Sequence, residues 1–238
     1  MPQVGKSENS DYRARLQLFK NYADEIWGGK GEAPLDKPMS DSSVMAPLKA
    51  NRGIVFPYTP NIYYARTANY GQMDFKGSNF PIYSYVNSNP PIIPIIAPFT
   101  ASSKEEAKYL LAVFRFLNVM SQSDFGERTI KNGTYGRPPA LMQFSYMGPF
   151  GFDRVPCILT DFNVLFTNTV DYVPVEHGVV ANDSKKDKFV SAFGDKEVTY
   201  VPTDVEFTIY LQPQYSPRRI RKDFSLDDMK RGANIGFI

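Results

Sequence analysis

The stretch DVEFTIYLQ, residues 204–212, alternates apolar and polar side chains without a break. A period of two is typical of a β-strand with one buried face and one face in water. The sequence therefore predicts a strand at the border of a hydrophobic core. Its buried side would carry Val205, Phe207, Ile209 and Leu211, and its wet side Glu206, Thr208, Tyr210 and Gln212.

Several other segments have the composition of strands. Residues 61–70, 82–87 and 140–147 are rich in Tyr, Ile, Phe or Met and lie close to Gly or Pro. Residues 155–167 predict a longer strand. Residues 90–99, PPIIPIIAPF, predict an edge strand or an irregular extended segment, because proline cannot donate to a ladder. On the longer strand, one face is expected to hold Ile158, Thr160, Phe162, Val164 and Phe166.

The best-defined helix begins after Ser103, which forms a predicted capping box with Glu106. Apolar positions recur with helical spacing from Ala107 to Met120, and the helix is expected to run to about Ser123. So much of its circumference is apolar that we expect a sheet on one side and a second element on another. One long helix among about seven or eight short strands predicts an α+β, β-dominated fold. The simplest arrangement is a β-sandwich or split β-barrel with the helix on its flank.

The N-terminal segment predicts a second helix. Residues 11–27 place apolar side chains alternately four and three positions apart, and Gly28 and Gly29 are expected to end the helix. A linker rich in Gly, Pro, Ser and Lys follows, so we expect an N-terminal arm over residues 1–50 and a main domain over residues 51–238. The helix would dock either on its own domain or on a partner protein. Its docking stripe consists of Tyr12, Leu16, Phe19 and Ile26.

Composition excludes several classes of site. The 238 residues include one Cys and one His, which excludes an internal disulfide, a cysteine zinc site and a multi-histidine metal centre. Cys157 is expected to be a buried structural residue, and His177 an exposed residue in a loop. The pairs Asp24–Glu25 and Asp227–Asp228 lack the apolar surroundings of an acid–base site. We therefore expect no enzymatic activity, no cofactor and no bound metal.

Charge and hydropathy limit the cell compartments and the classes of binding partner that suit this chain. Lys and Arg total 27 against 25 Asp and Glu, which is weak support for a dedicated nucleic-acid binder. No apolar run has the length of a membrane-spanning helix, and the N-terminus lacks the apolar region of a signal peptide. We expect the chain to fold in a reducing cytoplasm.

A cluster of four basic residues lies near the C-terminus. A predicted short helix follows it, capped by Ser225 with Asp228. The cluster could contact a neighbouring subunit, contact nucleic acid or be a solvated tail, and we expect subunit contact. A scaffold rich in Tyr and Phe without a catalytic set suits an assembly protein, whose surfaces bind neighbours. The cluster consists of Arg218, Arg219, Arg221 and Lys222.

Four stretches resemble the tube-initiator proteins in the baseplate of contractile-tailed bacteriophages, which are relatives of the tail tube protein. They extend together over about residues 53–231. The most specific of the four is residues 97–126, with a Pro-Phe-Thr start, a capped helix and a Phe-Gly end. They are FPYTPNI (56–62), APFTASSKEEAKYLLAVFRFLNVMSQSDFG (97–126), GRPPALMQFSYMGPFGFDRVPCILTDFNV (136–164) with VDYVPV (170–175), and LQPQYSPRRIRKDFSL (211–226).

The resemblance implies a tail-tube-like β-barrel with a flanking helix. It also implies a homo-hexameric ring that joins the baseplate hub and wedge proteins to the tail tube and initiates tube assembly. Genomic DNA would pass through the lumen without specific binding, and the protein would reside in the virion after assembly in the host cytoplasm. The N-terminal helix would then dock on the hub. The major tail tube protein, or another distal tail ring, is the alternative, and a baseplate hub enzyme is a more distant one.

Overall fold

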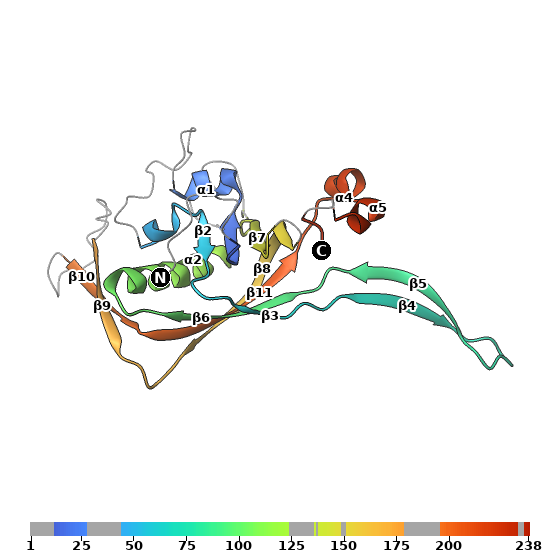
Figure 1. Ribbon diagram of the computed structural model, residues 1–238, viewed down its shortest axis with the longest axis horizontal. Helices are drawn as coiled ribbons and strands as arrows, with labels where there is room; N and C mark the ends of the chain where they lie inside the picture. The colour runs from blue at the N-terminus through green and yellow to red at the C-terminus, as the bar shows by residue number, and fades with distance from the viewer. Residues whose placement is uncertain are drawn as a thin grey trace.

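The computed structural model describes residues 12–27, 44–123, 136, 138–148, 151–178, 196–232 and 236–238. Strands account for 42% and helices for 22%, which confirms the predicted β-dominated class and is compatible with α+β. The described strands form one large antiparallel sheet and two separate hairpins (Figure 1). The order in the large sheet is β2 (Gly53–Val55), β1 (Arg15–Leu18), β7 (Met142–Tyr146), β8 (Phe152–Phe166), β11 (Asp204–Pro213), β6 (Ile93–Thr100) and β3 (Asn61–Ile62).

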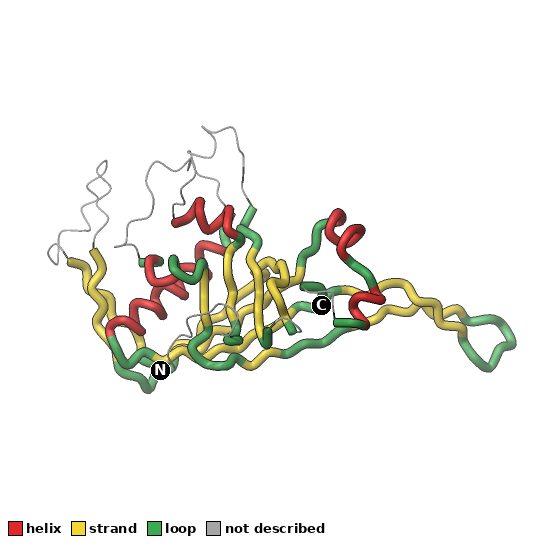
Figure 2. Tube along the Cα trace, turned by 45° about the horizontal axis from the view of Figure 1, so that its top comes forward, coloured by secondary structure: helices red, strands yellow, loops and turns green. Residues whose placement is uncertain are grey.

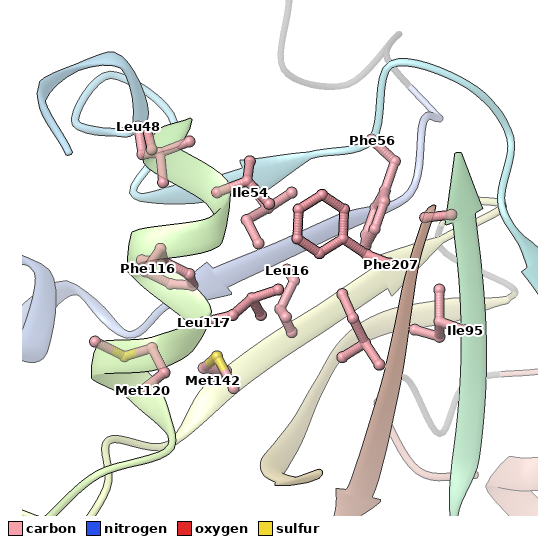
Figure 3. Packing of buried hydrophobic residues seen from close by; sticks show 14 of the residues in the cluster. Leu16, Leu48, Ile54, Phe56, Ile95, Phe116, Leu117, Met120, Met142 and Phe207 are labelled. Atoms are coloured by element: carbon pink, nitrogen blue, oxygen red, sulfur yellow. The ribbon is translucent and has the colours of Figure 1, made fainter. Parts of the chain in front are cut away.

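β11 lies between β8 and β6 and confirms the predicted alternation. Its odd-numbered residues from Val205 to Leu211 are buried, while the even-numbered ones are partly exposed on the opposite face. The ring of Phe207 meets that of Phe99 on β6 edge-on, with 5.1 Å between the centroids. β11 therefore supplies part of the centre of the core (Figure 3).

β6 shows how a proline-rich segment enters a sheet. The backbone N–H of Tyr63 donates to the carbonyl of Pro94 (3.2 Å), so Pro94, and Pro98 four residues later, turn their backbones toward the β3 side. β3 pairs there only with Ile95 and Ile96. The two prolines thus lack an N–H on the side of β6 that is least covered, as expected for a strand near a sheet edge.

The predicted face of β8 is wrong in its first half. A bulge interrupts the pairing with β11, because Tyr210 pairs with Asp161 and Leu211 pairs with Leu159, which leaves Thr160 without a partner in register. One extra residue reverses the alternation of side chains along the strand. The core side holds Val155, Cys157 and Leu159 before the bulge and Phe162, Val164 and Phe166 after it, whereas Ile158 and Thr160 lie on the outer side.

The predicted long helix is α2 (Lys104–Met120). The hydroxyl of Ser103 accepts from the N–H of Glu106 (3.3 Å), and the Glu106 carboxylate accepts from the N–H of Ser102 (2.8 Å). The reciprocal bond of the capping box is thus displaced by one residue, and both bonds satisfy donors at the helix start. The helix ends at Met120, three residues before the predicted end near Ser123.

Two layers cover α2, as predicted. Phe116 and Leu117 pack toward the large sheet (Figure 3). On another side lies the hairpin of β9 (Tyr172–Gly178) and β10 (Lys196–Pro202), whose Val175 and Val201 belong to the same buried cluster. Contacts within a single chain therefore account for the apolar side chains around much of the circumference of α2.

The N-terminal segment departs from the prediction of one helix. β1 is a strand inside the large sheet, between β2 and β7, and α1 (Lys20–Trp27) begins only after it. Ala14, Leu16 and Leu18 are buried with a period of two. The spacing of four between Tyr12 and Leu16 suits a strand as well as a helix, so pairing with β2 and β7 decides the outcome.

The predicted boundary near Asn51 is also wrong for the described part of residues 1–50. β1 shares the sheet and the core of the main domain. The ring of Trp27 lies parallel to that of Phe116 on α2, with 6.2 Å between centroids, and Leu48 in the 3-10 helix η1 (Ala46–Leu48) is fully buried. These residues form one hydrophobic core with residues 51–238.

Tyr109 on α2 closes the edge of the large sheet. Its hydroxyl donates to the carbonyl of Val55 on β2 and accepts from the N–H of the same residue, both at 2.8 Å. Burial raises the pKa of Tyr109 to about 12, so this hydroxyl remains a donor at neutral pH. One side chain thus satisfies two backbone groups that an edge strand would leave unpaired.

Tyr109→Phe is expected to lower the free energy of unfolding by about 1–3 kcal/mol, because both groups of Val55 lose their partner in a partly buried place. Urea unfolding measures the change. Tyr22→Phe on α1, where the ring is partly exposed, is the control and is expected to change stability by less than about 0.5 kcal/mol. Equal stability of the two variants would contradict the role assigned to Tyr109.

A second hairpin projects from the body. β4 (Thr67–Met73) and β5 (Ile82–Asn89) extend away from the large sheet, at the end of the molecule opposite β9 and β10 (Figure 1, Figure 2). α4 (Pro217–Asp223) and α5 (Leu226–Lys230) lie on the hairpin's side of the body. No helix in the described ranges is long and apolar enough to cross a membrane.

Candidate interaction surfaces

The projecting hairpin, residues 67–89, is held together by its own cross-strand contacts. Tyr70 pairs with Tyr85, and their rings meet edge-on with 5.7 Å between centroids. The side chain of Asn69 donates to that of Asn87 (2.8 Å). None of its residues belongs to the buried core. A two-stranded hairpin is at best marginally stable in water by itself, so a partner surface would stabilise this one.

Both faces of the hairpin are apolar and exposed. Register places three tyrosines on one face, where Tyr83 is 61% exposed. The other face is aliphatic, and Val86 there is 62% exposed. Exposed apolar side chains gathered in this way are typical of a surface that binds another molecule. The tyrosine face consists of Tyr70, Tyr83 and Tyr85, and the aliphatic face of Met73, Ile82 and Val86.

The edges of the hairpin carry none of the residues that usually prevent association. Its two strands, TANYGQM and IYSYVNSN, contain no proline and no charged residue. Natural edge strands are commonly protected by proline or lysine. Pro94 and Pro98 have this position on the side of β6 that β3 covers only in part. The contrast within one chain indicates that the projecting hairpin is open to a partner.

A second exposed apolar surface lies at the opposite end, on β9 and β10. Val175 and Val201 face the core, so the alternate positions face outward. Tyr172 and Tyr200 are 62% and 66% exposed there. We call this outward side the acceptor face, and it consists of Tyr172, Pro174, Glu176, Val198, Tyr200 and Pro202.

The two ends differ in charge. Residues 161–178 and 196–212, which include the acceptor face, contain six carboxylates and one Lys. Residues 217–231, on the hairpin's side, contain six basic and three acidic residues. The near-neutral total conceals an acidic end and a basic end.

The predicted basic cluster forms α4, a helix that our sequence analysis missed. The missed signal is Ser216 followed by Pro217, an N-cap residue before a proline in the first turn. Arg218, Arg221 and Lys222 are exposed. Nothing in the structure tests the subunit contact predicted for them.

Arg219, the fourth member of the cluster, is half-buried and faces its own chain. Its guanidinium lies 5.2 Å from the ring centroid of Phe237 and 6.0 Å from that of Tyr215, and the two rings stack at 4.9 Å. The hydroxyl of Tyr215 accepts from the N–H of Ile238 (3.1 Å), and burial raises the pKa of Tyr215. Arg219 therefore holds the C-terminal residues against the start of α4 and is not free for a partner.

The predicted docking stripe of the N-terminal helix is dispersed. Leu16 is a core residue of β1, Ile26 packs against the core from α1, and Phe19 is half-buried between the two elements. Tyr12 lies over Gly148, where an added β-carbon would come within 2.8 Å of its ring. The four residues do not form one surface for a partner, because β1 and α1 use them within the domain.

The other chemical candidates carry no site among the described residues. Cys157 is buried and burial raises the pKa of its thiol to about 12, which matches the structural role predicted for it. His177 lies in strand β9 and not in the loop that we predicted. Asp227 and Asp228 lie in the first turn of α5, as expected, and the side chains of Asp24 and Glu25 are not described. The described part of the chain holds no group of His, Cys, Asp or Glu suited to a metal ion.

Comparison with known proteins adds no assignment. No family model matches the chain, and no curated protein matches it significantly.

Proposed function

We propose that this protein is a structural subunit of the baseplate of a contractile-tailed bacteriophage. Its hexameric ring would join the baseplate hub to the tail tube and initiate tube assembly, without enzymatic activity. The observation that carries the proposal is the projecting hairpin, which is exposed and apolar on both faces and lies outside the core. A surface of this kind suits a protein that completes its structure by assembling. The resemblance of residues 53–231 to tube initiators supplies the identity of the assembly.

The outer face of the large sheet suits the wall of a channel for DNA. On β6, β11 and the second half of β8, the outward side chains are polar, apolar or acidic, and Asp161, Asp204 and Glu206 are the charged ones. A wall without Lys or Arg would not retain phosphates, because phosphate binding depends on basic side chains. A tail-tube-like sandwich or barrel with this face toward the lumen is part of the proposal.

Replacement of residues 67–89 by a short Gly–Ser turn is expected to convert the hexamer into a monomer. The thermal unfolding temperature of the monomer is expected to stay within a few degrees, since the hairpin contributes nothing to the core. Native mass spectrometry of the purified protein measures the first result, and scanning calorimetry the second.

The control is the double variant Tyr22→Ser and Val119→Ser, which removes exposed apolar side chains from α1 and α2. It is expected to keep the hexamer. A wild-type protein that remains monomeric at all concentrations would contradict the proposal, as would a hairpin-replaced protein that still forms the ring.

A further inference from the structure

The projecting hairpin and the acceptor face lie at opposite ends of one molecule, and each exposes aromatic side chains (Figure 1, Figure 2). We propose that the hairpin of one copy docks on the acceptor face of the next copy, in a head-to-tail contact. This inference rests on the proposed ring, because it names the two surfaces that join its subunits. Two different surfaces on each copy form a heterologous interface, which closes into a ring when the rotation between copies permits.

The charges at the two ends favour docking of the hairpin on the acceptor face over docking on a second hairpin. α4, with Arg218, Arg221 and Lys222 exposed, lies on the hairpin's side of the body (Figure 1). Contact between two such sides would place like charges near one another, which disfavours that pairing. The acceptor end carries the exposed carboxylates Asp171 and Glu176, and the described strands β9 and β10 contain one Lys, Lys196, and no Arg.

Apolar chemistry supports the same pairing. The tyrosine face of the hairpin has no charged member, and the acceptor face has one, Glu176. Tyr rings bury large area at low entropic cost, so two Tyr-rich faces suit one another as the centre of an interface. The carboxylates of the acceptor end and the basic residues of α4 would then lie at its rim.

Two defective variants and their mixture test the contact. The hairpin variant replaces Tyr70, Tyr83 and Tyr85 by Ser. The acceptor variant replaces Tyr172, Val198 and Tyr200 by Ser. Each alone is expected to be monomeric, with the dissociation constant of self-association raised by about tenfold or more. Mixed together, they are expected to form a 1:1 dimer that does not grow, because each copy retains the surface that the other lacks.

The outcomes distinguish failure of this contact from failure of the proposed ring. An acceptor variant that still forms the hexamer would overturn this pairing while leaving the proposed ring intact. A monomeric wild-type protein would contradict the ring and the pairing together. Absence of the 1:1 dimer from the mixture, when both variants are folded by circular dichroism, would also overturn the pairing.

Charge reversal provides a second test that leaves the aromatic surfaces unchanged. Arg218→Glu with Arg221→Glu and Lys222→Glu is expected to weaken self-association by about tenfold at low salt, as is Asp171→Lys with Glu176→Lys. The two reversed chains mixed together are expected to recover the wild-type affinity of one contact. No recovery, or no loss in either reversed chain, would overturn the assignment of α4 to the acceptor end.

Discussion

Leu16→Ala is expected to lower the free energy of unfolding by about 2–5 kcal/mol, a large part of the total stability of an ordinary domain. Leu16 is completely buried on β1, between β2 and β7, and its side chain packs in the shared core. Truncation would leave a cavity that the surrounding strands can fill only in part. Urea unfolding at protein concentrations where the chain is monomeric measures the change.

The neighbouring residue supplies the control. Gln17→Ala removes one hydrogen bond, from the Gln17 side chain to the carbonyl of Asn51 (2.7 Å), and is expected to cost about 1 kcal/mol. Deletion of residues 1–50 extends the test, and is expected to give a chain that does not fold. A separate docking arm could be removed without loss of stability, so a folded protein after this deletion would contradict the place of β1 in the core.

Phe207→Ala is expected to destabilise the protein by about 3–5 kcal/mol. The ring of Phe207 lies on β11 near the middle of the large sheet, and it contacts Phe99, whose ring in turn lies 6.1 Å from that of Phe56. Loss of the ring would remove the centre of this aromatic row. The unfolding midpoint in urea, with the slope of the transition unchanged, reports the loss.

The adjacent Thr208 faces outward on the same strand, so Thr208→Ala is a matched control. It is expected to change stability by less than about 0.5 kcal/mol. Similar losses in the two variants would contradict the buried and wet faces assigned to β11.

Elements whose signal is local could be predicted from the sequence. The capping residues and apolar spacing of α2 lie within one continuous segment, and the alternation of β11 needs no knowledge of its neighbours. Cys157 was correctly assigned to the interior, since it lies in an apolar run. The basic cluster was visible as charge, but the turning of Arg219 toward Phe237 depends on a contact 18 residues along the chain that no spacing rule indicates.

Elements that depend on distant partners could not be predicted in this way. β1 resembles part of a helix until it pairs with β2 and β7, and the bulge at Thr160 exists only in register with β11. Residues 82–87 were predicted as strand, but whether a strand lies in a core or projects into solvent depends on the remainder of the fold. The exposure of the hairpin, which carries the proposed function, therefore lay beyond sequence reasoning.

Sequence alone was enough for the β-dominated class, the long capped helix and the buried face of residues 204–212, because each follows from the period of side chains along a short segment. Contacts in the folded chain show that residues 15–18 complete the core and that residues 67–89 remain outside it. The tertiary structure also placed the acidic and basic segments at opposite ends, since their separation is a matter of chain path and not of composition. Pairing, burial and the position of charge depend on contacts between segments that are far apart in the chain, and no short segment contains that information.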